Sequence, residues 1–386
     1  MIPNNHLMPL SSRPDVVMSS GTGSWLTDTE GRRYLDFIQG WAVNALGHAP
    51  IELQQALTSQ SALLLTPSPA YFNAPQLQLA AALCEKTGLD LAWFCSSGTE
   101  ATECAIKLAR KWGQRRLAGA YEVISATNAF HGRTLTAMAA GGKPGFERMF
   151  LPQTPGFKKV AFGDLEALRS EISDHTAAVL LEPIQGEAGV LMPPPGYLRA
   201  VRELCRERGL LFMLDEIQTG LGRTGSMFRF QTEECQPDVL LLGKQLGSGV
   251  PLAGVLCRED AYHLDPGEHG GTYGGNPLMA ACGLAVLAAI DDGVLQNVQQ
   301  RSAQLVLGLN HLSHAFGGAV RGAGLLLALE LNRPIAAEVV QTARERGLLV
   351  NAPRPSTLRF MPQLRVSADE VTLMLERLGD SLRPHA

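Results

Sequence analysis

Residues 91–116, LAWFCSSGTEATECAIKLARKWGQRR, predict a strand that leads directly into a helix. The first five residues are apolar throughout, as in a strand that is covered on both faces, and small or apolar residues recur at helical spacing from Glu100 to Arg116. Ser97, Gly98 and Thr99 stand at the junction. Glycine lets an anion approach the backbone, and a helix N-terminus offers free N–H groups. The junction is a candidate phosphate site, or else an ordinary helix cap.

Further apolar runs repeat this pattern along the chain. Strand candidates lie at residues 121–125, 177–182, 210–215, 238–243 and 253–257, with helical stretches such as 196–208 between some of them. Strands that alternate with helices indicate βαβ units, so we predict an α/β fold with a mostly parallel central sheet.

The predicted pattern of secondary structure changes after residue 277. One helix is predicted for residues 277–300, followed by short strands at 324–331, 348–351 and 357–360 and helices at 335–346 and 367–378. We expect a large domain at residues 46–285 and a smaller α+β domain at 286–386. Residues 1–45, with strands at 24–27 and 33–37, are expected to pack with the smaller domain.

Composition narrows the class of protein. The 386 residues are 45% apolar and 18% charged with a net charge of −4, which fits a globular enzyme and excludes a disordered chain. No long basic run or long apolar run is present, so we expect neither nucleic acid nor membrane as a partner. The N-terminus lacks the pattern of a secretory signal. Seven cysteines without paired spacing indicate reduced thiols in a cytoplasmic protein.

Ligands of open α/β sheets bind beyond the carboxyl ends of the strands, and two charged residues stand there. Asp215 closes the run 210–215, where a carboxylate needs a partner. A protonated heterocyclic nitrogen would suit it, with Gln218 donating to an oxygen of the same ring. A helix cap or an ion pair is the simpler interpretation of Asp215.

Lys244 follows the apolar run 239–242 and Gly243. A lysine held in such a place can lose its proton and form a Schiff base, although most lysines are solvated surface groups. Phe130 is either a core residue or a stacking platform. Arg133 is suited to a bidentate contact with a carboxylate.

Together these segments resemble the class III family of pyridoxal-phosphate-dependent aminotransferases over nearly the whole chain. The resemblance is carried by residues 94–101 (FCSSGTEA), 130–134 (FHGRT), 182–187 (EPIQGE), 214–225 (LDEIQTGLGRTG), 270–277 (GGTYGGNP), Lys244 and Arg359-Phe360. It implies the fold of the aspartate-aminotransferase-like transferases (fold type I), with pyridoxal 5'-phosphate as cofactor and no metal.

The resemblance also implies how the cofactor is held. Lys244 would form the Schiff base and move the proton, and Asp215 would pair with the pyridine nitrogen. The remaining contacts would be a phosphate site at Ser97, Gly98 and Thr99, a stacking ring at Phe130, a ring-hydroxyl partner at Gln218, and Thr272 from the second subunit of a homodimer with shared active sites.

Substrate contacts follow in the same way. Arg133 would take a substrate carboxylate, and Arg359 would take the α-carboxylate of glutamate or 2-oxoglutarate. Glu187 would neutralise Arg359 when the amine donor has no carboxylate there. Gly271 stands where the family often has Ser or Thr, so a substrate or phosphate contact is expected to be missing.

Within the family, the resemblance is strongest to members that act on acetylornithine. It implies ping-pong transfer of the terminal amino group of N2-acetyl-L-ornithine to 2-oxoglutarate, giving N-acetyl-L-glutamate 5-semialdehyde and L-glutamate, a step of arginine biosynthesis. Other donors remain open, namely succinyldiaminopimelate, succinylornithine, ornithine and 4-aminobutyrate, and so does a mutase or racemase reaction.

Three interpretations from other functional classes compete with an aminotransferase. Gly220, Gly222 and Gly225 match a dinucleotide fingerprint of an NAD-dependent dehydrogenase, but no helix start follows them. His311 and His314 have helical metal-ligand spacing without a third ligand nearby. A pyridoxal-phosphate carrier without activity would not need the complete set of Lys244, Asp215 and Arg133.

Overall fold

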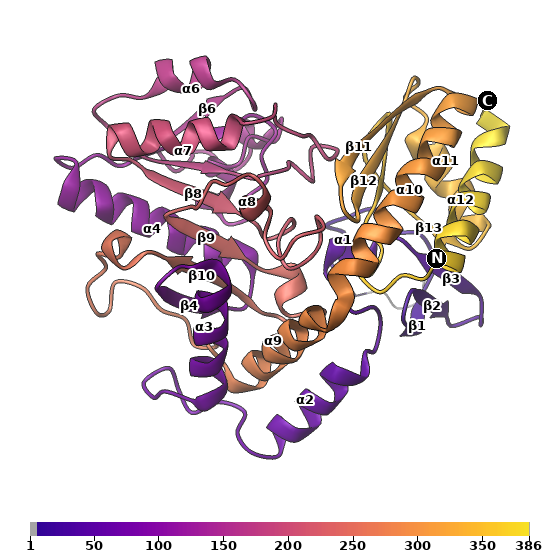
Figure 1. Cartoon of the computed structure of the whole chain (residues 1–386), viewed down its shortest axis with the longest axis horizontal. Helices are drawn as coiled ribbons and strands as arrows, with labels where there is room; N and C mark the ends of the chain where they lie inside the picture. The colour runs from indigo at the N-terminus through magenta and orange to yellow at the C-terminus, as the bar shows by residue number, and fades with distance from the viewer. Residues whose placement is uncertain (1–5, 386) are drawn as a thin grey trace.

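The computed structural model describes residues 6–385, which form two lobes joined by a long helical segment (Figure 1). A seven-stranded sheet forms the large lobe, in the order β4-β10-β9-β8-β7-β5-β6. Only β10 runs antiparallel to its neighbours, which confirms the mostly parallel sheet. The strands are β4 (Leu91–Cys95), β5 (Glu122–Ala126), β6 (Phe157–Val160), β7 (Thr176–Leu181), β8 (Leu211–Asp215), β9 (Val239–Leu242) and β10 (Ala253–Cys257).

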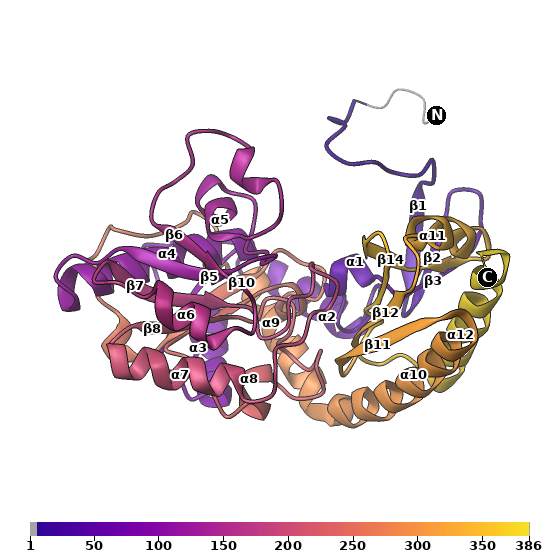
Figure 2. The same cartoon turned by 90° about the horizontal axis from the view of Figure 1, so that it is seen from above.

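Helices cover both faces of this sheet, which explains the uninterrupted apolar runs. Figure 2 shows α4 (Gly98–Arg116) on one side and α7 (Tyr197–Arg208) with α6 (Leu165–Glu171) on the other. Strand residues alternate between two core clusters. In β8, Leu211 and Met213 pack in the cluster beneath α4, whereas Phe212 and Leu214 pack in the cluster that includes α7.

The helix predicted for residues 277–300 is longer than expected and is broken. It consists of α9 (Pro277–Ala289), a π-turn (Ile290–Val294) and α10 (Leu295–Phe316). Gly293 has a φ of 77°, which turns the chain between α9 and α10.

Pro277–Phe316 is also the single helical segment within residues 6–385 that is long and apolar enough to cross a membrane, judged by length and composition. The sequence did not indicate such a segment, because no long uninterrupted apolar run is present in it. Its first part, α9, packs against α2 (Ile51–Ser61) and α3 (Ala74–Thr87), so packing within the fold accounts for much of its apolar character.

The small lobe holds an antiparallel sheet in the order β11-β12-β15-β14. Its strands are β11 (Gly318–Ala323), β12 (Leu326–Leu331), β14 (Asn351–Arg354) and β15 (Thr357–Phe360), and its helices are α10, α11 (Ala336–Glu345) and α12 (Ala368–Leu382). A second sheet joins β1 (Met18–Thr22), β2 (Trp25–Asp28) and β3 (Arg33–Asp36) to β13 (Leu348–Leu349), which is parallel to β3. The N-terminal strands therefore pair with a strand from the C-terminal part of the chain.

Short elements complete the description of residues 6–385. The short α-helices are α1 (Gln39–Ala42), α5 (Leu135–Ala140) and α8 (Arg229–Thr232), and the 3-10 turns are Phe146–Arg148, Lys244–Leu246, Glu259–Ala261 and Arg383–His385.

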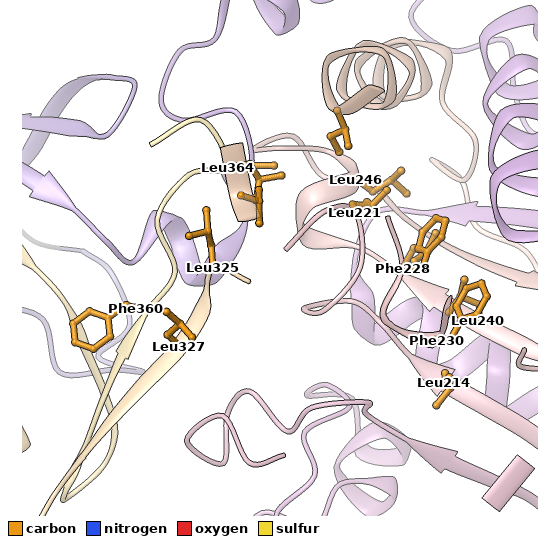
Figure 3. Packing of buried hydrophobic residues seen from close by; sticks show 14 of the residues in the cluster. Leu214, Leu221, Phe228, Phe230, Leu240, Leu246, Leu325, Leu327, Phe360 and Leu364 are labelled. Atoms are coloured by element: carbon orange, nitrogen blue, oxygen red, sulfur yellow. The ribbon is translucent and has the colours of Figure 1, made fainter. Parts of the chain in front are cut away.

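One apolar cluster runs from the large lobe into the small lobe (Figure 3). Phe228 and Phe230 stack with their ring centroids 5.7 Å apart beside the large sheet, and Leu325 and Phe360 belong to the small-lobe side of the same cluster. The two lobes thus share one core, which fixes the cleft between them.

We expect Phe228→Ala to lower the free energy of unfolding by about 3–5 kcal/mol, because the ring is fully buried and its removal leaves a cavity. Urea unfolding followed by circular dichroism measures this. The control is Leu307→Ala, whose side chain is 75% exposed on α10 and should change stability by no more than about 0.5 kcal/mol. Equal losses in the two variants would contradict the shared core.

Candidate active site

A cavity of about 280 Å³ opens where the strands of the large sheet end. Nine of the twelve residues that the sequence singled out line it, and Thr272, Gly271 and Arg359 do not. The lining consists of Ser97, Gly98, Thr99, Phe130, His131, Gly132, Arg133, Glu182, Ile184, Glu187, Asp215, Ile217, Gln218, Thr219 and Lys244.

The N-terminus of α4 forms one end of the cavity. Ser97 precedes the helix in an extended conformation, and its hydroxyl donates to Glu100 over 2.7 Å instead of capping the helix backbone. A Cβ at Gly98 would lie 2.8 Å from the side chain of Ile217, so a larger residue here would force Ile217, in the loop after β8, to move. Thr99 accepts hydrogen bonds from the backbone N–H groups of Arg133 and Thr134, each over 3.2 Å. These hydrogen bonds hold the start of α4 against the loop after β5, and both segments line the cavity.

Asp215 ends β8 with its side chain buried and oriented. One carboxylate oxygen accepts from the Ile217 N–H over 3.1 Å, and the other lies 2.8 Å from Nδ1 of His131. The ring of His131 is fully buried, and its Nε2 has no hydrogen-bond partner within residues 6–385. The partner that Asp215 requires is therefore partly supplied by a histidine that the sequence reasoning passed over, although it stands in the segment FHGR.

Lys244 begins a 3-10 turn directly after β9, with a φ of 40°. Part of its side chain is accessible from the cavity. Burial of the ammonium lowers the pKa of Lys244, and the charge of Arg359 adds to this effect, whereas Glu187, Asp215 and Glu182 oppose it. A lysine in this position has a larger neutral fraction at neutral pH than a surface lysine.

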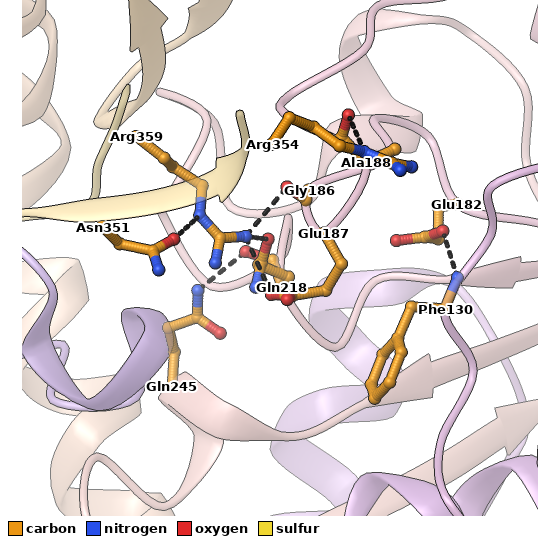
Figure 4. A network of polar contacts seen from close by, with 10 residues as sticks. All are labelled: Phe130, Glu182, Gly186, Glu187, Ala188, Gln218, Gln245, Asn351, Arg354 and Arg359. Atoms are coloured by element: carbon orange, nitrogen blue, oxygen red, sulfur yellow. Dashed lines mark hydrogen bonds and ion pairs between the residues drawn. The ribbon is translucent and has the colours of Figure 1, made fainter. Parts of the chain in front are cut away.

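Arg359, which is buried, forms an ion pair with Glu187, whose side chain is 26% exposed and lines the cavity (Figure 4). Arg359 projects from β15, and its Nη1 donates to Oε1 of Glu187 over 2.8 Å, to the carbonyl of Gly186 over 2.8 Å and to Gln218 over 3.3 Å. Its Nε donates to Asn351 over 3.0 Å. Although burial favours the neutral acid, the charges of Arg359 and Lys244 lower the pKa of Glu187 to about 2. Glu187 is therefore an anion at neutral pH.

Glu182 is a second carboxyl group near the cavity, and the sequence alone indicated no role for it. Its Oε2 accepts from the Phe130 N–H over 3.0 Å (Figure 4), which holds the loop that carries the phenyl ring. Burial and the charge of Asp215 raise the pKa of Glu182 well above its usual value. Arg133, in contrast, is exposed at the rim of the cavity.

The family model "Aminotransferase class-III" matches residues 9–382. The chain belongs to the class III aminotransferases.

Its relatives include an acetylornithine aminotransferase of Ralstonia nicotianae, 46% identical over 99% of this chain and 98% of the relative. Acetylornithine aminotransferase 2 of Bordetella bronchiseptica is 48% identical over 97% and 96% of the two chains. Among solved structures, the N-acetylornithine aminotransferase of Stenotrophomonas maltophilia has a TM-score of 0.85 at 34% identity, covering 97% of each chain. The ornithine aminotransferase of Toxoplasma gondii has a TM-score of 0.92 at 34% identity, covering 98% of this chain and 93% of that one.

Class III aminotransferases are fold type I enzymes that use pyridoxal 5'-phosphate, and the fold and cofactor expected from the resemblance are thereby confirmed. The residues of this class III aminotransferase fit that cofactor. The cavity combines a helix start at Gly98, an oriented carboxylate at Asp215 and a lysine of lowered pKa at Lys244. These are groups that suit a phosphate, a ring nitrogen and a carbonyl carbon respectively.

Thr272 and Gly271 lie in the loop before α9, outside the cavity of their own chain. Thr272 is exposed, and nothing in the described chain brings it to Lys244. A Cβ at Gly271 would have its nearest contact 3.9 Å away, at Trp93. Crowding within the chain therefore does not explain why this class III aminotransferase has glycine where the family often has Ser or Thr.

The competing motifs of the sequence do not form sites in residues 6–385. Gly220, Gly222 and Gly225 lie in successive turns between β8 and α8, without the helix start that a dinucleotide fingerprint requires. His311 and His314 are exposed on α10, and no group of three His, Cys, Asp or Glu residues in the described chain is placed to hold a metal ion. The seven cysteines are free thiols.

Proposed function

We propose that this class III aminotransferase moves the terminal amino group of N2-acetyl-L-ornithine to 2-oxoglutarate, producing N-acetyl-L-glutamate 5-semialdehyde and L-glutamate in arginine biosynthesis. The ion pair between the buried Arg359 and the cavity-lining Glu187, both of which influence the pKa of Lys244, carries the proposal. One pocket must accept a diacid and also a donor that presents an uncharged chain at the same place. A cation that can be neutralised by a neighbouring carboxylate meets both requirements. The names of the relatives support the donor.

When bound, pyridoxal phosphate supplies an electron sink for the electrons released as the substrate C–H bond breaks. In our proposal, the Asp215 carboxylate holds the positive charge of the ring nitrogen. His131 and the Ile217 N–H keep that carboxylate in one orientation. The carboxylate therefore needs no rearrangement during the reaction.

Lys244 is the proposed tether and proton carrier. Its Nζ would accept the proton from the substrate carbon and return a proton during the same half-reaction. Because burial lowers the pKa of Lys244, the neutral amine that accepts the proton is accessible at neutral pH. Its position at a strained backbone (φ 40°) fixes where Nζ can reach.

The remaining contacts are assigned by the same proposal. Ser97, Gly98 and Thr99 would hold the phosphate, and Phe130 would stack on the ring, with its loop held by Glu182. Gln218 would lie near the ring hydroxyl. Arg133 would bind the carboxylate of acetylornithine, and Arg359 that of 2-oxoglutarate.

We also propose that the enzyme is a homodimer with shared active sites. Thr272 does not reach the proposed phosphate site of its own chain. It is exposed, and its neighbour Tyr273 is 66% exposed. Phe72, before α3, is 85% exposed. Exposed aromatic side chains of this size favour burial against a second copy.

Two further assignments belong to the proposal. Free cysteines, six of them buried, favour a reducing compartment such as the cytoplasm. The division into residues 1–45, 46–285 and 286–386 remains our description of the functional units, with the cleft formed between the last two.

The proposal is tested with a panel of amine donors and 2-oxoglutarate, measuring glutamate formed by the purified holoenzyme. N-acetylornithine should give the highest kcat/KM among N-acetylornithine, N-succinylornithine, ornithine, 4-aminobutyrate and N-succinyldiaminopimelate. A higher value for any other donor would reassign the substrate, and no glutamate with any donor would refute the function.

Glu187→Gln should affect the two half-reactions unequally. The neutral amide leaves the buried Arg359 uncompensated against the uncharged part of the donor, so kcat/KM for N-acetylornithine should fall about 10- to 100-fold, as for loss of a hydrogen bond to a charged group. The half-reaction with 2-oxoglutarate should be unchanged or faster. Stopped-flow absorbance of each half-reaction measures both values, and a parallel loss in both would contradict the role of Glu187.

A further inference from the structure

The loop that carries Glu187 is closed on itself by backbone hydrogen bonds. Gln185 and Leu191 exchange N–H···O bonds of 3.0 and 3.1 Å at its base. Inside the loop, the carbonyl of Gly186 accepts from the N–H groups of Gly189 and Val190 over 3.2 and 3.3 Å. The carbonyl groups of the loop therefore point in fixed directions.

Three arginines from one sheet of the small lobe bind successive parts of this loop. Arg359 on β15 donates to the carbonyl of Gly186 over 2.8 Å. Arg354 at the end of β14 donates to the carbonyl of Ala188 over 3.3 Å (Figure 4). Arg321 on β11 donates to the carbonyl of Gly189 over 2.9 Å. The loop is thus attached to the small lobe on both sides of Glu187.

Arg321 is itself fixed by a carboxylate. Its Nη2 lies 2.7 Å from Oε2 of Glu330 on β12. The same Oε2 accepts a hydrogen bond from the Thr357 hydroxyl over 2.6 Å, and Oε1 of Glu330 accepts one from the Ser356 hydroxyl. Although partial burial opposes the charged form, these hydrogen bonds lower the pKa of Glu330. Glu330 therefore stays charged and keeps Arg321 in place.

Arg354 connects two loops of the large lobe. Besides Ala188, it donates through Nη2 to Oδ1 of Asn128 over 2.9 Å. Asn128 lies two residues before Phe130, in a left-handed conformation with a φ of 65°. One side chain from β14 thereby ties the loop of Phe130 to the loop of Glu187.

We propose that Arg354, assisted by Arg321, is a positioning residue that holds the backbone of loop 186–189 so that Glu187 meets Arg359, and that it thereby sets the selectivity between the amine donor and the diacid acceptor. This inference rests on the function proposed above. With the backbone held, only the side chain of Glu187 has to turn aside when a diacid binds Arg359. With the backbone released, Glu187 is no longer held against Arg359, and the buried guanidinium faces the uncharged donor without compensation.

The test compares Arg354→Met with Arg333→Met in the holoenzyme. Arg333 is an exposed arginine of the same lobe that lies outside these loops. The quantity measured is kcat/KM for the N-acetylornithine half-reaction divided by kcat/KM for the 2-oxoglutarate half-reaction. Arg354→Met should lower this ratio about fivefold, as expected for one or two hydrogen bonds, and Arg333→Met should leave it unchanged.

A double-mutant cycle separates positioning from general damage. In a Glu187→Gln background, Arg354→Met should change the ratio by less than about twofold, because the carboxylate that it positions is already absent. If Arg354→Met does not retain cofactor, Asn128→Gly decides, since it removes one contact of Arg354 and keeps the left-handed backbone. Here too we expect the ratio to fall.

Two outcomes overturn the inference: an unchanged ratio in a variant that retains cofactor, or the same fall of the ratio with and without Glu187. Failure of the proposed function gives a different result, because the wild-type enzyme would then show no half-reaction with N-acetylornithine.

Discussion

Lys244→Ala is expected to lower kcat/KM for transamination by about 10³-fold or more. In the proposed function, Nζ of Lys244 holds the cofactor and moves the substrate proton, and within residues 6–385 no other lysine lines the cavity. The measurement is glutamate formation with N-acetylornithine and 2-oxoglutarate, together with the cofactor absorbance of the purified variant.

Lys159→Met is the matched control for this experiment. Burial lowers the pKa of Lys159 on β6 to about 8, but its Nζ donates to the carbonyl of Ala139 over 2.7 Å and does not line the active-site cavity. A lysine of lowered pKa that lies outside the active-site cavity should be dispensable for the chemistry, so kcat should be retained. Full transamination by Lys244→Ala would refute the assignment of the proton carrier.

Asp215→Asn should lower kcat by about 10²- to 10⁴-fold while the fold survives. The amide keeps the size of the side chain but removes the negative charge that would hold the ring nitrogen protonated, so the electron sink is lost. Asp215→Ala should be at least as inactive. Single-turnover absorbance of the half-reactions measures the loss.

Asp238→Asn supplies the comparison with another buried carboxylate. Asp238 is 1% exposed and pairs with Arg202 and Arg258 at 3.0 and 2.9 Å, before β9 and outside the cavity. It should lower the melting temperature without changing kcat, because breaking a buried pair destabilises the fold. If both substitutions changed stability alone, Asp215 would be a structural residue.

The inner strands of the large sheet could be predicted because they are buried on both faces and are therefore continuous apolar runs, so residues 253–257 were predicted with the bounds that β10 has. The apolar run 91–95 also matches the bounds of the partly exposed edge strand β4, whereas the edge strand β6, with the sequence FKKV, was missed. The strand β11, with the sequence GAVRGA, has partly exposed residues and no apolar run, and it was missed. Helices α2 and α3 were missed as well, since their apolar and polar residues are weakly segregated.

The break in the long helix could not be predicted from periodicity. The apolar pattern continues on both sides of residues 291–293, and only the backbone shows that Asp292 is non-helical and that Gly293 has a positive φ. These two residues change the direction of the chain within an otherwise helical segment.

The active site was predictable as far as it follows strand ends. Asp215 is the last residue of β8, and Lys244 and Glu187 lie in the loops that follow β9 and β7, so neighbouring parallel strands bring these residues together. His131 and Glu182 were not given roles, because their roles depend on contacts with Asp215 and Phe130 that are 84 and 52 residues away in the chain. The hydrogen bonds from Arg321, Arg354 and Arg359 to loop 186–189 join the two lobes, so they leave no local pattern in the sequence.

The central claim is that one cavity, lined by Lys244, alternates between N-acetylornithine and 2-oxoglutarate. Stepwise titration of the holoenzyme, followed by cofactor absorbance, tests it most directly. N-acetylornithine alone should convert the absorbance to that of the aminated cofactor, and 2-oxoglutarate added next should restore the starting spectrum in a stoichiometric amount. A spectrum that N-acetylornithine leaves unchanged, or that 2-oxoglutarate does not restore, would contradict the account.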